Sequence, residues 1–351
     1  MKKYLFIFII LMIFTQTGNV LSSENIFIVN NIKINNSSIK NRQELINKSF
    51  KKGFIKLNQK ILLKKDFEKV KNTDLKTIKN LISHYQIQKK NNQENINITE
   101  INIYFKKDKI YNFFYNNNLK YSDISEKELK IFPIIIEEND FIIFDNNYLY
   151  KNWINTSQKK NSSFDLIDYI LPLENIEIID NINNYKENLE LIKLEDLFDE
   201  HINKDNLFII VDNKNKETKI FIKGMISSNK VIKNIIFNNN EIDKEKKYNE
   251  ILIFLKEEIF EIVKSQNIID VRTPSFFNIK LTIKKQNDLI KFQNILREVD
   301  LIENYYVNEF SQNSAFIKIK FYGKINKITD KLSQKGININ VDNEKWEASL
   351  R

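Results

Sequence analysis

The chain has 351 residues, with 55 Lys and Arg against 46 Asp and Glu and a hydrophobic content of 42%. That length favours two or three domains, and the apolar content is enough to build their cores, which excludes a wholly disordered chain. The absence of cysteine excludes disulfides, thiolate metal sites and a cysteine nucleophile, and 5 scattered glycines leave no glycine-rich phosphate loop.

The first residues have the pattern of an export signal. Lys2 and Lys3 precede an apolar run at residues 4–14, which is long enough for the core of a signal peptide and too short to span a bilayer as a helix. We therefore expect residues 1–22 to be a signal peptide and the mature chain to lie in the periplasm or cell envelope. Cleavage after Ser22 or Ser23 would place Val20 or Leu21 at a position where signal peptides usually have a small residue. An uncleaved segment that anchors the chain in the membrane is therefore the alternative. Membrane contact is expected only through that segment.

The net charge of +9 suggests an anionic partner. However, only four of the basic residues are arginines, the side chain that binds phosphate in a bidentate manner, and the lysines are interspersed with acids. Nucleic acid is therefore not the expected partner. Binding of anionic lipid or another polyanion by a lysine-rich surface stays open as an alternative.

An α+β unit is expected over residues 23–125. Apolar residues recur at three- and four-residue steps from Leu45 to Ile61, which predicts a helix with one buried stripe. Gly53 lies on that stripe, where a missing side chain permits close approach to a sheet. The other expected elements are a strand at residues 26–34, a helix at 74–83, a strand pair at 85–88 and 96–105, and a short helix at 110–116.

An α/β unit is expected over residues 126–240. The continuous apolar run at residues 131–136 is typical of a strand that is buried on both faces. Strands that alternate with helices favour a largely parallel, doubly covered sheet. The other expected strands are at residues 141–144, 167–173, 176–179, 207–211 and 218–226, with a helical stretch at 189–198. A long helix is expected in the connecting segment, residues 241–270.

A ferredoxin-like unit is expected over residues 271–351. Its predicted order is βαββαβ, with strands at residues 277–283, 305–310, 315–321 and 337–341, and helices at 289–299 and 325–332. Gly336 is placed to end the second helix. The fold class is therefore mixed α+β and α/β, in three units in series. Because the ferredoxin-like fold hosts many unrelated activities, it does not indicate a function.

The densest group of chemically reactive side chains is at residues 195–201. If this segment is an α-helix, Asp196 and Glu200 share a face and His201 follows them, which gives a weak candidate metal site for a metal-assisted hydrolase. The favoured interpretation is a solvated helix face, because no second histidine is nearby. In that interpretation the side chains of Leu194, Leu197 and Phe198 pack inward.

Three further groups are interpreted as structural. His84 is expected at a helix end, and Asp165 at the start of a turn rather than paired with Asp168. The aromatic residues between Tyr111 and Tyr121 are flanked by lysines, like a stacking platform for nucleic acid or glycan. Core packing of a short helix is favoured for them. No catalytic residue and no cofactor is assigned from the sequence.

The order of these features resembles a known family. The shared features are the signal peptide, the apolar strand at residues 131–136, Trp153, the Leu-Pro-Leu-Glu segment at residues 171–174 and the Phe-Tyr-Gly segment at 321–323. The chain resembles the exported proteobacterial family known only as domain of unknown function number two thousand and sixty-six. The resemblance implies an envelope protein of Gram-negative bacteria without an assigned reaction, and it supplies no catalytic residues.

The sequence as a whole favours a non-enzymatic envelope protein that binds another envelope protein or assembles with it. The metal-assisted hydrolase and the lysine-rich binder of anionic lipid or polyanion are the alternatives.

Overall fold

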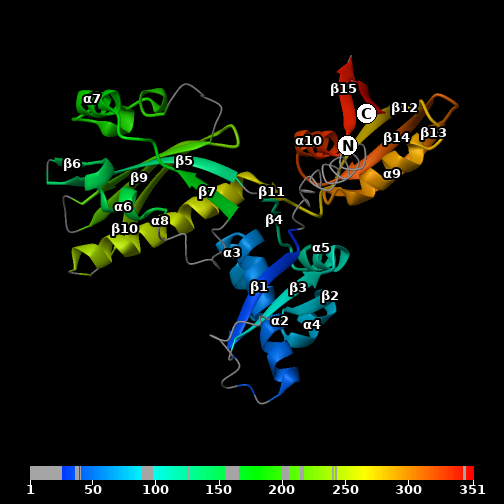
Figure 1. The fold of residues 1–351 in the computed structure, drawn as a ribbon, viewed down its shortest axis with the longest axis horizontal. Coiled ribbons are helices and arrows are strands. Elements are labelled where there is room, and N and C mark those ends of the chain that lie inside the picture. The colour runs from blue at the N-terminus through cyan, green and yellow to red at the C-terminus, as the bar shows by residue number, and fades with distance from the viewer. Residues whose placement is uncertain are drawn as a thin grey trace, which may run out of the picture.

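The computed structural model describes residues 26–35, 39, 41–88, 98–124, 127–138, 140–154, 166–198, 205–213, 217–238, 241, 243–342 and 345–351. The expected signal peptide, residues 1–22, lies outside this part of the chain. Helices and sheets are mixed along the described residues, as the sequence predicts (Figure 1).

The first sheet is antiparallel and is covered by helices of the same region. Its strand order is β1 (Ile28–Asn35), β3 (Ile98–Phe105) and β2 (Ile82–Gln88), and α2 (Arg42–Ile61) packs on it. A methyl group at Gly53 would lie 2.6 Å from Cδ1 of Ile103 and 2.9 Å from Cδ1 of Ile32, which confirms the predicted close approach. The remaining helices here are α3 (Lys64–Val70), α4 (Leu75–Leu81) and α5 (Lys107–Asn116).

The middle sheet is mixed rather than largely parallel. The strand β5 (Lys127–Glu137) pairs in parallel with β7 (Ile167–Ile170) and β8 (Asn206–Asp212), as predicted for this region. The strands β6 (Asp140–Ile142), β9 (Thr218–Ile226) and β10 (Asn229–Phe237) are antiparallel to their neighbours, which corrects the prediction. Ser227 and Ser228 have φ values of 51° and 63° between β9 and β10, the geometry of a tight hairpin turn, so β10 returns beside β9 without a crossover.

Two layers cover the middle sheet. One layer consists of α6 (Tyr148–Asn152) and the long helix α8 (Lys244–Gln266), which confirms the predicted connecting helix. The other contains α7 (Ile176–Asn184), where the sequence predicts a strand at residues 176–179. The side chain of Asn175 accepts a hydrogen bond from the amide of Glu177 and caps α7, and Ile178 and Ile182 lie one helical turn apart on its buried side.

Pro133 lies inside β5, where one ladder hydrogen bond is lost because proline has no N–H. The buried side chain of Asn147 reaches this point and donates hydrogen bonds to the carbonyls of Pro133 and Ile142, each at 2.9 Å. Its oxygen accepts from the amides of Leu149 and Tyr150 and so caps α6. One asparagine therefore joins the strand to the helix that covers it.

The C-terminal sheet contains the predicted order of strands and helices plus one more strand. Its order is β13 (Ile302–Phe310), β14 (Ser314–Phe321), β12 (Ser275–Thr282), β16 (Lys345–Leu350) and β15 (Ile337–Asp342), with α9 (Asp288–Glu298) and α10 (Ile325–Gln334). In a ferredoxin-like sheet the strand after the second helix pairs with the first strand. Here β16 takes that place, parallel to β12, and Trp346 of β16 packs against Phe277 of β12 with ring centroids 5.7 Å apart.

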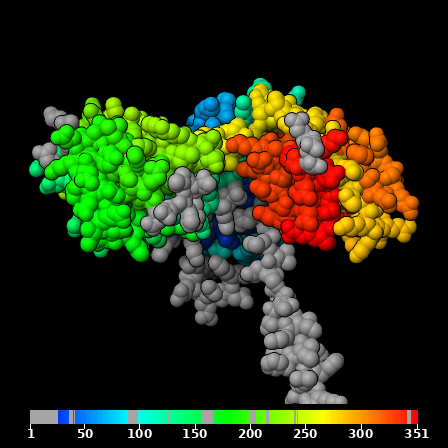
Figure 2. All heavy atoms as spheres, turned by 90° about the horizontal axis from the view of Figure 1, so that it is seen from above, coloured from blue at the N-terminus to red at the C-terminus, as the bar shows by residue number. Residues whose placement is uncertain are grey.

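The first and last regions share one continuous apolar core, whereas the middle sheet has its own core on each face. Short strands β4 (Tyr121–Ser122) and β11 (Ile268–Ile269) pair where the three regions meet. In Figure 2 the middle region (green) and the C-terminal region (orange to red) form two lobes, with part of the N-terminal region (blue) between them. The longest helix therefore links a separate lobe to the shared core.

Candidate functional site

The predicted metal cluster is only partly within the described residues. Asp196 is the last residue of the short 3-10 turn Leu194–Asp196, and Glu200 and His201 lie outside the part that the structure describes. The α-helix predicted at residues 189–198 is replaced by two 3-10 turns, Leu189–Leu191 and Leu194–Asp196. Within the described part of the chain, no three His, Asp or Glu side chains are grouped as metal ligands.

The other sequence candidates are placed as follows. His84 lies in β2 and not at a helix end, because β2 begins directly after α4, and its ring stacks on Tyr104 with centroids 4.1 Å apart. Asp168 is exposed in β7, and Asp165 is outside the described residues. Tyr111 and Tyr121 are buried with their hydroxyl groups 2.9 Å apart, and burial raises the pKa of both phenols. Core packing is thus confirmed for Tyr111, Phe114 and Tyr121, but it is wrong for Tyr115, which is 57% exposed.

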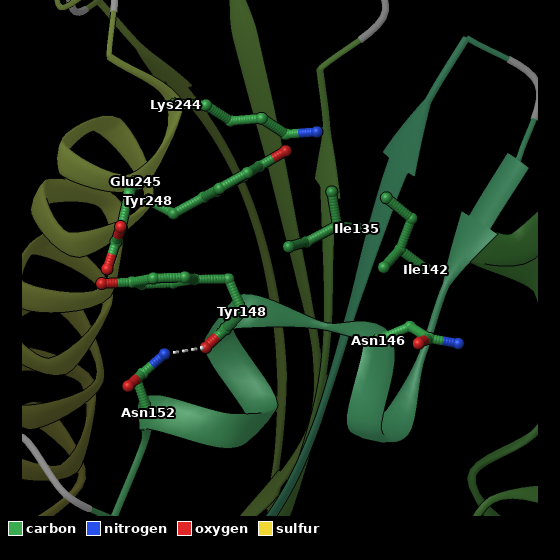
Figure 3. Close-up of a pocket in the computed structure, with 8 residues that line it drawn as sticks. All are labelled: Ile135, Ile142, Asn146, Tyr148, Asn152, Lys244, Glu245 and Tyr248. Carbon is green, nitrogen blue, oxygen red and sulfur yellow. Dashed lines mark hydrogen bonds between the residues drawn. The ribbon is translucent and has the colours of Figure 1, made fainter.

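A pocket lies near the carboxyl end of β5, between β6, α6 and the start of α8, and we call it the carboxyl-end pocket (Figure 3). Crevices outside the carboxyl ends of parallel strands are the usual ligand sites of α/β sheets. The pocket has a volume of about 410 Å³. Its lining comes from β5, β6, the 3-10 turn Phe144–Asn146, α6 and the first turns of α8: Ile135, Ile142, Asn146, Tyr148, Asn152, Lys244, Glu245 and Tyr248.

A polar network closes one side of this pocket. Tyr248 donates its hydroxyl hydrogen to Oε1 of Glu137, and Lys244 donates to Oε2 of the same carboxylate at 2.7 Å. Asn213, the residue after β8, donates to the Tyr248 oxygen at 3.4 Å and accepts from Lys247 at 2.7 Å. The group thus joins the ends of both strands to the start of α8.

The protonation states in this network follow from its contacts. Burial raises the pKa of Tyr248, and its hydrogen bond to Glu137 raises it further. Burial also raises the pKa of Glu137, but hydrogen bonds from Lys244 and Tyr248 outweigh this effect and lower the pKa below its usual value. At neutral pH the network therefore contains a neutral phenol and a carboxylate whose two oxygens already accept hydrogen bonds.

The rest of the pocket is suited to holding an apolar or aromatic group. The ring of Tyr148 stacks against that of Tyr248, with centroids 5.9 Å apart, and Ile135 and Ile142 form the opposite wall. Asn152 donates to the main-chain oxygen of Tyr148 at 3.0 Å, the dashed line in Figure 3. Because Glu137 is already engaged by two donors, the arrangement favours recognition over proton abstraction.

A second concave surface lies between the end of β7 and the start of α7, and we call it the β7–α7 groove. Its volume is about 650 Å³, and Ile178, Leu197 and Phe198 are among the residues that line it. At its rim Leu173 is 85% and Ile176 is 76% exposed. The main chain here is held by Tyr150, whose hydroxyl donates to the carbonyl of Pro172 at 2.7 Å.

Sequence reasoning did not identify these two sites. The strand predicted at residues 176–179 would have placed Ile176 in a sheet rather than at an exposed rim. Glu137 and Tyr248 are 111 residues apart in the chain, so no local motif joins them. The one available signal was that Glu137 directly follows the apolar run at residues 131–136, and Asn213 comes two residues after the run at 207–211.

Comparison of the chain with protein-family models, with curated proteins and with solved structures found no match. Among the described residues, no helix combines the length and the apolar character needed to cross a membrane.

Proposed function

We propose that this chain is an exported protein of the Gram-negative cell envelope that binds another envelope protein and has no catalytic activity of its own. Export is supported by Lys2 and Lys3 followed by the apolar run at residues 4–14. The resemblance to the exported proteobacterial family described above supports the same location. The architecture in this proposal is three units in series, 23–125, 126–240 and 271–351, the last a ferredoxin-like unit extended by β16.

The observation that carries this proposal is the exposed apolar rim of the β7–α7 groove. Leu173 and Ile176 are large side chains on one short segment, and they adjoin further apolar side chains in the groove. Exposed apolar patches beside a concave surface are typical of protein interaction sites. Full burial of one such side chain contributes about 2 kcal/mol.

The groove is also preorganised, which favours binding. The hydrogen bond from Tyr150 to Pro172 and the cap that Asn175 provides for α7 hold the segment on both sides of Leu173. A surface that is already ordered loses less conformational entropy when a partner binds.

The test is recovery of a partner from the periplasmic fraction by the purified chain. The Leu173→Asp, Ile176→Asp double variant should recover at least tenfold less partner than the wild-type chain. The matched control is Ile290→Asp, because Ile290 is 56% exposed on α9, away from the groove. Equal recovery by all three chains would refute the role of the groove, and turnover of a metabolite without any partner would refute the proposed function.

The two alternative functions predict different results for the same purified chain. A metal-assisted hydrolase that uses Asp196, Glu200 and His201 should lose metal content when all three are replaced by alanine. A lysine-rich binder of anionic lipid or polyanion should lose affinity steeply as salt is raised, whereas apolar contacts in the groove should not. Retained partner binding at high salt supports the groove.

A further inference from the structure

Among the described strands, β10 lies at one end of the middle sheet and pairs with β9 alone. It pairs with β9 at nine consecutive positions, from Asn229 opposite Ile226 to Phe237 opposite Thr218, with no register shift. A regular edge strand presents a row of unpaired N–H and C=O groups to any further strand. The contacts described for β10 include no strand on its other side.

Most other edge strands in the described part of the chain are irregular or short; the exception is β15, which pairs with β16 at six consecutive positions. The strand β13 has two register shifts, and β1 and β2 have one each. The strand β6 has only three residues. Irregular, short or lysine-bearing edges are among the means by which proteins prevent strand addition; β10 is neither irregular nor short, although it carries Lys230 and Lys233.

Two large apolar side chains of β10 are exposed among its polar ones. Ile232 is 55% and Ile236 is 59% exposed, and they lie on the same face with Asn234 between them. A groove of about 520 Å³, lined by Asn234 and Ile236 together with residues 186–190, separates this part of the strand from the layer that covers the sheet. On the opposite face Lys233 is neutralised by an ion pair with Glu258 of α8.

We propose that β10 pairs in an antiparallel manner with β10 of a second copy of this chain, around a twofold axis at Asn234. In this register Ile232 lies opposite Ile236 of the second copy, and Val231 lies opposite its Phe237. Asn234 faces its own counterpart, and Lys233 lies opposite Ile235. A twofold interface requires such self-complementarity, because each pair occurs twice.

The two neighbouring registers of the β10 pair bring less favourable side chains opposite each other. With the axis at Lys233, the two copies of that lysine face each other, and like charges directly opposite are unfavourable. With the axis at Ile235, Ile236 faces Asn234 and Lys233 faces Phe237. Only the register centred on Asn234 pairs both exposed isoleucines with each other and places no lysine opposite another. The proposal is independent of the β7–α7 groove, because it uses no residue of that groove.

The absence of cysteine provides a direct test. In the proposed pair the Cα atoms at position 234 lie about 4.5–5.5 Å apart, within the range that a disulfide can bridge. Asn234→Cys should therefore form a reducible dimer under mild oxidation. Lys230→Cys is the matched control on the same face of the same strand, where the two copies would be about 26 Å apart. We expect cross-linking at 234 to be at least tenfold faster.

Sedimentation equilibrium of the purified chain gives the second readout. The wild-type chain should dimerise, and the Ile232→Lys, Ile236→Lys double variant should be monomeric while its circular dichroism spectrum is unchanged. Ile290→Lys, an exposed isoleucine elsewhere, should still dimerise. A monomeric wild-type chain, equal cross-linking at 230 and 234, or a folded double variant that stays dimeric would each overturn the proposal. If β10 instead pairs with a strand of a different protein, the purified wild-type chain would be monomeric.

Discussion

At the scale of single residues, two lysines buried in α8 are unusual. Lys256 is 5% exposed, and its ammonium group donates a hydrogen bond to the main-chain oxygen of Trp153. It also lies 5.8 Å from the ring centroid of Tyr169. Burial lowers the pKa of Lys256 to about 8. The folded protein therefore binds this proton more weakly than the unfolded chain does.

The low pKa predicts a pH-dependent stability. Between pH 8 and pH 10 the folded chain loses the Lys256 proton, whereas the unfolded chain, with a lysine pKa of about 10.4, keeps it. The contribution of Lys256 to the free energy of unfolding therefore rises with pH. Lys256→Met removes this contribution. We expect the stability of the variant relative to wild type to fall by about 1–3 kcal/mol from pH 7 to pH 10.

Urea unfolding at both pH values measures this difference. Lys246→Met, at an exposed position of the same helix, should leave the pH dependence unchanged. Parallel stability curves for wild type and Lys256→Met would contradict the assigned pKa shift.

At the scale of elements, two glycines permit close packing, but with different consequences. Gly53 of α2 faces the ends of the Ile103 and Ile32 side chains, which can rotate away. Gly224 of β9 faces the backbone, since a methyl group there would lie 2.0 Å from the carbonyl oxygen of Asn206 in β8. Side chains adjust far more readily than a strand that is paired on both sides.

The two glycines predict that alanine at position 224 destabilises the protein more than alanine at position 53. Gly224→Ala should lower the free energy of unfolding by about 3 kcal/mol or more, because the clash forces β8 and β9 apart. Gly53→Ala should cost less, about 0–2 kcal/mol, because alanine gains about 1 kcal/mol in helix propensity against the overpacking. Chemical denaturation of both variants gives the comparison, and a larger loss for Gly53→Ala would show that the β8–β9 contact is not rigid.

At the scale of the whole molecule, the C-terminal half of α8 joins the middle sheet to the first region. The buried ammonium group of Lys264 donates to the carbonyl of Leu62 at 2.6 Å and to that of Gln59 at 3.3 Å, and it forms an ion pair with Glu261. These carbonyls belong to the C-terminal end of α2, which carries partial negative charge and favours a cation. The Glu261 carboxylate also accepts from the amide of Lys64 at the start of α3.

Removal of this contact should weaken the link between α8 and the first region. Lys264→Met leaves the two α2 carbonyls and Glu261 without the ammonium group, and we expect a loss of about 2–4 kcal/mol in the free energy of unfolding. Amide hydrogen exchange should increase at the end of α2 more than inside the C-terminal sheet. The Lys246→Met chain serves again as control, and unchanged exchange at residues 58–62 would refute this role for Lys264.

Local patterns in the sequence were sufficient to predict the helices and strands that have a clear apolar periodicity of their own. The apolar stripe of α2 with Gly53, the buried strand β5 and the alternating strands β12 and β14 were predicted, because each periodicity is a property of consecutive residues. The same reasoning failed at residues 176–179 and 189–198, where short apolar segments are compatible with a strand, a helix or a 3-10 turn.

The sequence by itself therefore determined the mixed α and β class, most of the long elements and the packing role of Gly53. Only the tertiary structure decided which strands became neighbours, where β16 was inserted, and how Glu137, Asn213 and Tyr248 came together beside one pocket. The physical reason is that periodicity is local, whereas pairing and burial depend on contacts between residues that are distant in the chain.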